Sequence, residues 1–111
     1  MSERIHKINE LIRQELAKIL LENINFESGE MVTVMSVDTS DNLETANIWI
    51  SIFPENKTGS CLDLLNKEIG NIQKMLNRKT SLRFTPRITF KLDKSERYVD
   101  EINGIFREIG D

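Results

Sequence analysis

The sequence predicts an α+β domain in which two helices cover one face of a three-stranded sheet. Residues 4–23 and 60–79 place apolar side chains at the three- and four-residue spacing of helices with one buried stripe. Residues 46–52 and 82–92 alternate with the two-residue period of strands, and the second helix lies between these two strands. Strands that are joined through a helix indicate an architecture of packed helix and sheet layers.

The first helix and the first strand have different apolar patterns. The helix stripe consists of Ile5, Ile8, Leu11, Ile12, Leu16, Ile19 and Leu20. After a loop that contains Ser28 and Gly29, residues 31–37 are rich in β-forming residues and apolar on both alternating sets of side chains. This pattern favours a central strand that is covered on both faces over an edge strand.

The second strand and the second helix follow a turn at residues 39–42. In the strand, apolar side chains occupy every second position, at Ala46, Ile48, Ile50 and Ile52. Pro54 ends this strand, which we expect to form a hairpin with the first strand. The following helix is predicted to run from an N-cap at Ser60 to about Lys79.

The third strand is predicted over residues 82–92, with Pro86 at its irregular beginning or at an edge position. Its apolar side comprises Leu82, Phe84, Pro86, Ile88, Phe90 and Leu92. A last helix ending at Gly110 is indicated by the apolar residues Val99, Ile102, Ile105, Phe106 and Ile109. The expected order of elements is therefore α-β-β-α-β-α.

Length and composition exclude several classes of protein. We expect residues 1–111 to form one domain. No apolar run approaches the roughly 20 residues of a membrane span, and the amino terminus lacks the apolar core of a signal peptide, so we expect a cytoplasmic protein without a membrane partner. Cys61 is the only cysteine and His6 the only histidine, which is too few for a disulfide, a zinc site or a Cys–His nucleophile pair. We expect Cys61 to be a small helix residue, His6 to be a surface side chain, and no cofactor to be required.

Positive charge is concentrated in one segment of an acidic chain. Residues 67–97 contain nine of the fifteen Lys and Arg but only three of the eighteen Asp and Glu, a local balance of +6. The remaining eighty residues sum to −9. Such an uneven distribution produces a directional field that suits an anionic partner, and nucleic acid is the leading candidate.

The candidate RNA contacts lie on two predicted elements and the loop between them. Four of them recur on the second helix, nearly opposite its apolar stripe: Lys67, Asn71, Lys74 and Arg78. The positive charge then continues through the loop and the third strand at Lys79, Arg83, Arg87, Lys91, Lys94 and Arg97. Phosphate contacts from adjacent elements are therefore expected, although a charged helix face by itself is also typical of ordinary solvation.

Gly70 lies inside the second helix, where glycine is unfavourable. One interpretation is a bend that brings backbone N–H groups of the next turn toward a phosphate, which makes Gly70 a candidate RNA contact. The other interpretation is close packing of the helix against a neighbour, or tolerated strain. The sequence leaves both open.

Three stretches of the chain carry a family resemblance. They are the helix of residues 4–20, the stretch 37–46 (VDTSDNLETA) and, most specifically, the stretch 82–95 (LRFTPRITFKLDKS). The last stretch is similar to the family pattern Leu-Arg-x-x-Pro-x-x-x-Phe-x-x-Asp-x-Ser. Over nearly its whole length the chain thus resembles the ribosome-binding factor A family. The resemblance implies a KH-like fold of the second type with a kinked second helix.

The resemblance also implies a function and partners. It implies a bacterial assembly factor that binds 16S rRNA and the free 30S subunit as a monomer and assists late maturation without catalysis. The family's Ala-x-Gly kink is replaced here by Glu68, Ile69 and Gly70, so a larger and negatively charged residue takes the place of the small one. The family's basic carboxyl-terminal tail has no counterpart before Asp111, so no contacts of such a tail are carried over.

Two other function classes compete with this interpretation. One is a KH-like protein-interaction module, possibly dimeric, whose basic face binds an acidic protein. Trp49 and Phe53 lie on the strand side opposite Ile48 and Ile52, where they either offer a stacking or protein-contact surface or pack under the last helix. The other class is an enzyme, which is disfavoured because the sequence has no Gly-rich phosphate loop and no nucleophile with a matching base.

Overall fold

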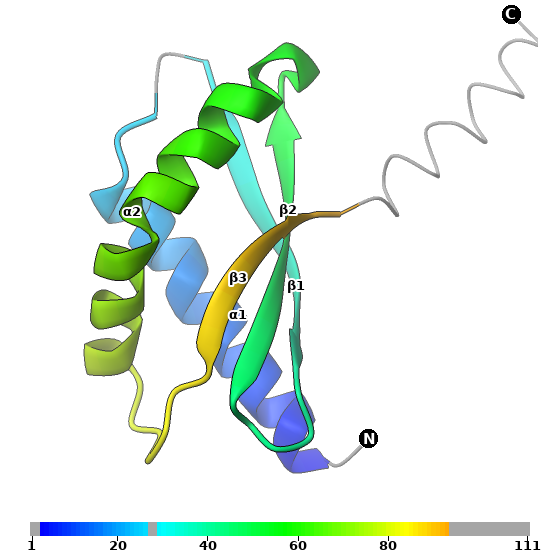
Figure 1. Ribbon diagram of the computed structural model, residues 1–111, viewed down its shortest axis with the longest axis vertical. Helices are drawn as coiled ribbons and strands as arrows, with labels where there is room; N and C mark the ends of the chain where they lie inside the picture. The colour runs from blue at the N-terminus through cyan, green and yellow to red at the C-terminus, as the bar shows by residue number, and fades with distance from the viewer. Residues whose placement is uncertain (1–2, 27–28, 94–111) are drawn as a thin grey trace, which may run out of the picture.

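The order of helices and strands in the computed structural model agrees with the predicted order as far as the third strand. The structure describes residues 3–26 and 29–93. The elements are α1 (Glu3–Asn23), β1 (Met31–Thr39), β2 (Thr45–Phe53), the short 3-10 turn η1 (Glu55–Lys57), α2 (Thr58–Lys79) and β3 (Arg87–Leu92) (Figure 1). The predicted last helix and the candidate residues Lys94 and Arg97 lie outside the described residues.

The three strands form one sheet in the order β1-β2-β3. β1 and β2 are antiparallel, with Met31 opposite Phe53 and Thr39 opposite Ala46. β2 and β3 are parallel, which requires the long crossover connection that α2 provides. The prediction that the first strand lies in the middle of the sheet is therefore wrong, because β2 is the central strand.

A β-bulge explains why β1 has apolar residues on both alternating sets. The pairing register shifts between Val34 and Ser36, so Met35 has no paired residue on β2. Beyond the bulge the buried side chains are Val37 and Thr39, on the set opposite to that of buried Val34. The alternating set of side chains that faces the helices therefore changes at the bulge. The apolar residues on both sets do not require β1 to be buried on both of its faces.

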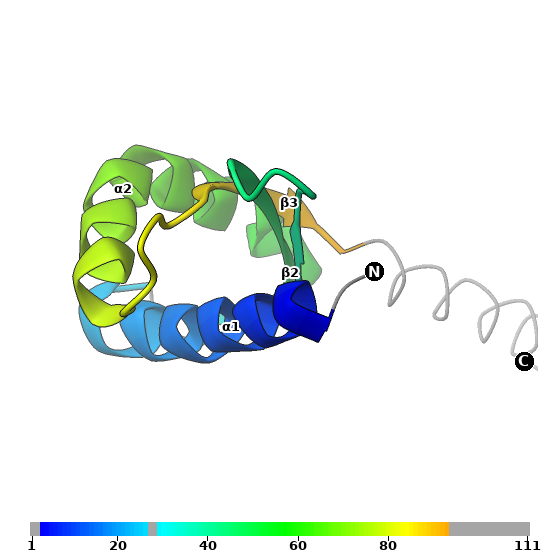
Figure 2. The ribbon, with the colours of Figure 1, turned by 90° about the horizontal axis from the view of Figure 1, so that it is seen from below.

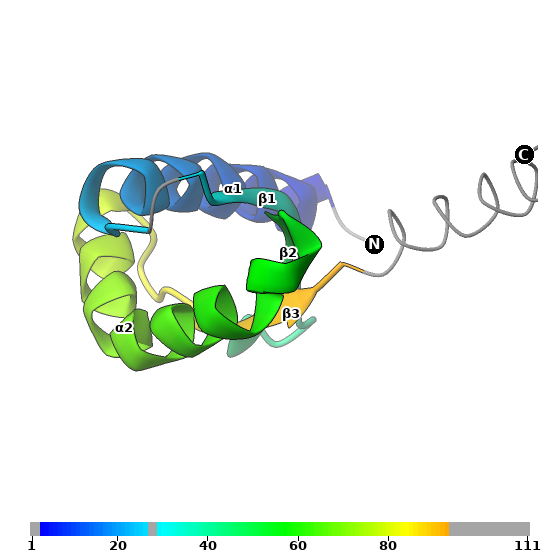
Figure 3. The same ribbon diagram turned by 90° about the horizontal axis from the view of Figure 1, so that it is seen from above.

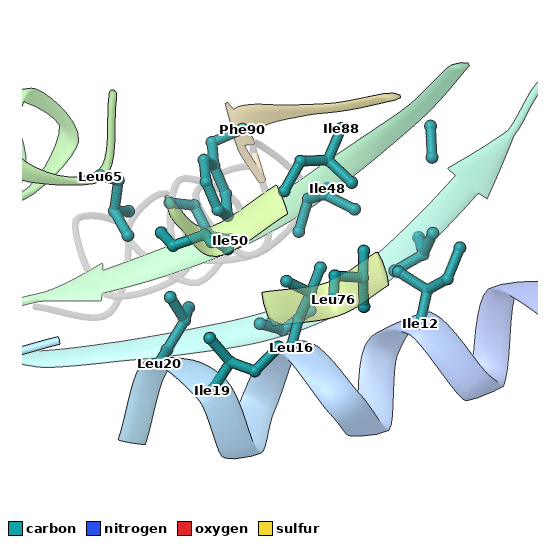
Figure 4. Packing of buried hydrophobic residues seen from close by; sticks show 14 of the residues in the cluster. Ile12, Leu16, Ile19, Leu20, Ile48, Ile50, Leu65, Leu76, Ile88 and Phe90 are labelled. Carbon is teal, nitrogen blue, oxygen red and sulfur yellow. The ribbon is translucent and has the colours of Figure 1, made fainter. Parts of the chain in front are cut away.

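Both helices cover the same face of the sheet, as the two views along the long axis show (Figures 2 and 3). The core lies between these layers (Figure 4). On β2, Ala46, Ile48 and Ile50 are buried against the helices, whereas Trp49 is half-buried on the opposite side. The predicted arrangement of two helices on one face of a three-stranded sheet is confirmed.

α2 begins earlier than predicted and without a side-chain cap. Its first residue is Thr58, and the capping position belongs to Lys57, whose side chain makes no capping hydrogen bond. The predicted N-cap, Ser60, lies inside the first turn, where its hydroxyl donates to the Lys57 carbonyl oxygen. The N-cap prediction is wrong because η1 leads directly into the helix and already provides its first turn.

β3 begins at Arg87, five residues later than predicted. Pro86 directly precedes it, which agrees with the prediction of an irregular start, since proline has no N–H to donate to a ladder. Residues 80–86 instead form the connection between α2 and β3, hereafter the α2–β3 loop. Residues 82–86 alternate between apolar and polar side chains as the following strand does, and this alternation alone suggested that they belonged to the strand.

The lone cysteine and histidine occupy the surroundings that were expected. Cys61 is a buried residue of α2, and its thiol donates a 2.9 Å hydrogen bond to the Glu30 carboxylate. His6 is exposed on α1. Within residues 3–26 and 29–93, no group of three or more His, Cys, Asp and Glu is placed to hold a metal ion.

Candidate nucleic-acid interface

The polar face of α2 is exposed from Lys67 to Arg78. Lys67, Asn71, Lys74 and Arg78 are all exposed. The apolar side of the same helix buries Cys61, Leu65, Ile72 and Leu76. The three- and four-residue spacing of both sets places them on opposite sides of the helix, so the four candidates face away from the core as the sequence predicted.

The candidates on β3 face a different direction. Ile88 and Phe90 are buried toward the helices, so Arg87 and Lys91, on the alternate positions, are exposed on the face of the sheet away from the helices. Arg83, in the α2–β3 loop, and Lys79, at the end of α2, are exposed between these two regions. The predicted residues therefore lie on two faces of the molecule that the loop connects, and not on one flat surface.

The positive side chains of this region have no acidic partners among the described residues. In that part of the chain, ion pairs join Lys7 to Glu3, Arg13 to Glu10 and Lys18 to Glu15, all within α1. No ion pair among residues 3–26 and 29–93 involves a cation of α2, the α2–β3 loop or β3. Residues 69–92 also contain six Lys and Arg and no Asp or Glu. Within the described structure, none of these cations is therefore neutralised by a direct ion pair with a carboxylate.

Gly70 lies near the middle of the sequence of α2. Figure 1 shows that α2 changes direction along its length. Among residues 3–26 and 29–93, a Cβ atom added at Gly70 would meet nothing within 4 Å, so the interpretation of close packing is wrong for the described part of the chain. Helical structure continues through this residue, and the bend creates no second helix N-terminus. Half-buried Glu68 accepts a 3.3 Å hydrogen bond from the Asn71 side chain, so the residue that departs from the family pattern engages one of the candidate contacts.

Gln73 joins α2 to the outer edge of β3, a role that the sequence did not indicate. Its side-chain nitrogen donates to the Pro86 carbonyl oxygen at 3.1 Å, and its side-chain oxygen accepts from the Ile88 N–H at 2.9 Å. Both groups of the carboxamide thus form hydrogen bonds with the backbone at the start of β3, as the backbone of a neighbouring strand would. The only signal in the sequence is a polar residue directly beside the apolar stripe of α2.

Phe84 also differs from its predicted environment. It was placed with the apolar side of a strand, but it lies in the α2–β3 loop and is 75% exposed. The Arg83 guanidinium carbon lies 5.5 Å from the centre of its ring, within the range of a cation–π contact. The adjacency of arginine and phenylalanine in a basic segment was the available signal.

Comparison with known proteins assigns the chain to a family. A family model described as ribosome-binding factor A matches residues 4–106. The chain belongs to the ribosome-binding factor A family. The resemblance of the chain to this family is therefore confirmed.

Ribosome-binding factor A proteins from several bacteria are similar along most of the chain. The protein of Akkermansia muciniphila is 38% identical over 104 residues, which cover 93% of this chain and 82% of that protein. The protein of Syntrophus aciditrophicus is 35% identical over 111 residues, covering 96% of this chain and 88% of that protein.

Solved structures of ribosome-binding factor A have the same KH-like fold. The crystal structure of the protein from Thermus thermophilus matches with a TM-score of 0.65 and 20% identity, over 79% of this chain and 94% of that one. A Thermus thermophilus homology model fitted into a cryo-EM map of a 30S complex also matches with a TM-score of 0.65 and 20% identity, over 82% and 96% of the two chains. The KH-like fold implied by the family resemblance is confirmed.

Proposed function

We propose that this member of the ribosome-binding factor A family binds the small ribosomal subunit during its assembly. It contacts 16S rRNA in the free 30S subunit, acts as a monomer in the cytoplasm and assists late maturation without catalysis. Family membership supports a ribosome-binding role, and a Thermus thermophilus relative was fitted into a map of a 30S complex. In the described ranges no helix is long and apolar enough to cross a membrane.

The observation that carries the proposal is the positive charge from α2 to β3, which is unpaired within the described residues. Each cation that contacts a phosphate releases counterions from the RNA, which favours binding and makes the affinity depend on salt. Lys7, Arg13 and Lys18 of α1 are already paired with carboxylates, so α2, the α2–β3 loop and β3 present the stronger attraction for RNA.

Binding alone is sufficient for this function. A bound protein shifts a conformational equilibrium by its difference in affinity for the two states. We therefore propose that the cations contact the mature arrangement of the RNA more favourably than the immature ones. The RNA contacts proposed are Lys67, Gly70, Asn71, Lys74, Arg78, Lys79, Arg83, Arg87 and Lys91.

The test is sedimentation of the full-length protein with purified 30S, 50S and 70S particles at low and moderate salt. We expect enrichment on free 30S subunits and weaker binding as salt rises. The variant Lys74→Gln/Arg78→Gln should bind more weakly, with a salt slope shallower by about 1 for each cation removed. Unchanged binding of this variant would exclude the α2 face as the RNA contact.

A matched control is available on α1. The variant Arg13→Gln/Lys18→Gln also removes one arginine and one lysine, but both are paired with Glu10 and Glu15 on the same helix. We expect it to sediment with 30S subunits as the unchanged protein does. Failure of the unchanged protein to bind any particle would favour the alternative of a protein-interaction module.

A further inference from the structure

Phe84 is an exposed aromatic side chain in a loop whose other large apolar side chains are at least partly covered. Leu82, two residues earlier in the α2–β3 loop, packs against the core, and Pro86 is fully buried. Phe84 is 75% exposed and so forgoes the hydrophobic stabilisation that burial of its ring would give. Its exposure is therefore particular to this position and is not shared by the loop as a whole.

The loop that carries Phe84 is closed by contacts at both of its ends. The hydroxyl groups of Thr80 and Thr85 are 3.1 Å apart, and Thr80 is buried. The Thr80 N–H donates to the Leu76 carbonyl at 3.0 Å, and Gln73 donates to the Pro86 carbonyl at 3.1 Å. Phe84 is thus presented by an ordered loop, which lowers the entropy lost when it contacts a partner.

The surroundings of Phe84 suit a nucleotide. The Arg83 guanidinium lies over one face of the ring, which leaves the second face for another planar group. Within residues 69–92 the neighbouring charges are all positive, including Arg78, Lys79 and Arg87. An aromatic ring among cations without carboxylates is the combination with which proteins bind single-stranded RNA, by stacking on bases and contacting phosphates.

We propose that Phe84 stacks on an unpaired base of single-stranded RNA, with Arg83 on the other face of the phenyl ring. This inference rests on the proposed function, because it names the kind of RNA that the basic surface binds. Stacking needs only the flat face of a base, so the contact selects for an unpaired nucleotide more than for a particular sequence.

The test compares two polyanions as probes of the full-length protein: a short single-stranded oligoadenylate and heparin, which has no bases. Phe84→Ala should weaken oligoadenylate binding by about 5- to 150-fold, the range for one stacked base, and leave heparin binding unchanged. Phe84→Leu, which keeps an apolar side chain but no ring, should behave like Phe84→Ala. Phe84→Trp should retain the affinity.

Phe53 provides a matched control. It is 66% exposed and ends β2, at the opposite end of the molecule from the α2–β3 loop (Figure 1). Phe53→Ala should bind both probes as the unchanged protein does. A direct readout comes from Trp49→Phe/Phe84→Trp, which moves the only tryptophan into the loop. Oligoadenylate should quench its fluorescence, and heparin should not.

Two results would overturn the inference. Oligoadenylate affinity of Phe84→Ala or Phe84→Leu equal to that of the unchanged protein would exclude stacking by the ring. Loss of 30S binding by Phe84→Ala with full oligoadenylate binding would assign Phe84 to a ribosomal protein instead. The proposed function fails separately, if the unchanged protein does not sediment with 30S subunits.

Discussion

The side-chain amide of Gln73 is hydrogen-bonded to the backbone of Ile88, so that α2 is fastened to the outer edge of β3. The oxygen accepts from the Ile88 N–H at 2.9 Å, while the nitrogen donates to the Pro86 carbonyl oxygen at 3.1 Å. Two backbone groups at the start of an edge strand are thereby satisfied by one side chain. The same contact fixes the end of the α2–β3 loop that carries Arg83 and Phe84.

Replacing Gln73 by leucine should therefore destabilise the protein. The substitution leaves the Ile88 N–H and the Pro86 carbonyl without these partners, and we expect a loss of about 1–3 kcal/mol in the free energy of unfolding. Urea unfolding followed by circular dichroism measures it. Gln14→Leu is the control, because Gln14 is exposed and only donates to Glu10 within α1. Equal stability of the two variants would show that the contact to β3 contributes little.

Two leucines on α1 separate the effect of burial from that of helix propensity. Leu16 is fully buried in the core, whereas Leu21 is 85% exposed. Leu16→Ala should lower the free energy of unfolding by about 2–5 kcal/mol, because it removes buried methyl groups and leaves a cavity. Leu21→Ala should change it by less than about 0.5 kcal/mol. A large loss from Leu21→Ala would instead indicate that a part of the chain outside the described residues, or a second molecule, covers this side chain.

The position of Gly70 inside a continuous helix predicts a gain in stability from Gly70→Ala. Gly70 is exposed, has room for a Cβ atom and lies inside a helix. Alanine should therefore raise the free energy of unfolding by as much as about 1 kcal/mol. Gly59→Ala, in the first turn of the same helix and with equal room, is the comparison and should add less. A loss of stability from Gly70→Ala alone would show that the bend needs a backbone conformation that alanine resists. Sedimentation of this variant with 30S subunits then tests whether RNA contacts depend on the bend.

Lys74 and Lys91 distinguish the two faces of the candidate interface. Lys74 belongs to the outer face of α2, and Lys91 to the sheet face away from the helices. We expect Lys74→Gln to lower the salt slope of 30S binding by about 1. Lys91→Gln should lower it by a similar amount, because Lys91 is also a proposed RNA contact. An effect of Lys74→Gln alone would limit the RNA contact to the outer face of α2.

The features that could be predicted from the sequence are those that depend on the spacing of side chains within a single helix or strand. The stripe of α1 and the alternation of β2 were correct for this reason, and so was the outward direction of the α2 cations. The position of β1 was wrong because one unpaired residue, Met35, shifts its pattern. The start of β3 was wrong because Pro86 ends a loop whose alternation imitates a strand.

The details of the candidate site depended on contacts between distant segments. Gln73 and Ile88 are fifteen residues apart, and no local pattern indicates their hydrogen bond. The absence of acidic partners for the cations of α2 and β3, within the described residues, likewise follows from which carboxylates the fold brings near. The exposure of Phe84 could be found only after β3 was seen to begin at Arg87.

The bulge in β1 affects how readily two copies of the protein can associate through this strand. In the sheet formed by the described residues β1 is an edge strand, and an edge strand with free N–H and C=O groups is a template on which another chain can add a strand. The extra residue at Met35 interrupts the regular spacing of these groups and increases the local twist. Asp38, exposed farther along the same strand, adds a charge that opposes close approach. The bulge that misled the prediction of the position of β1 thus also disfavours aggregation through the edge of this strand.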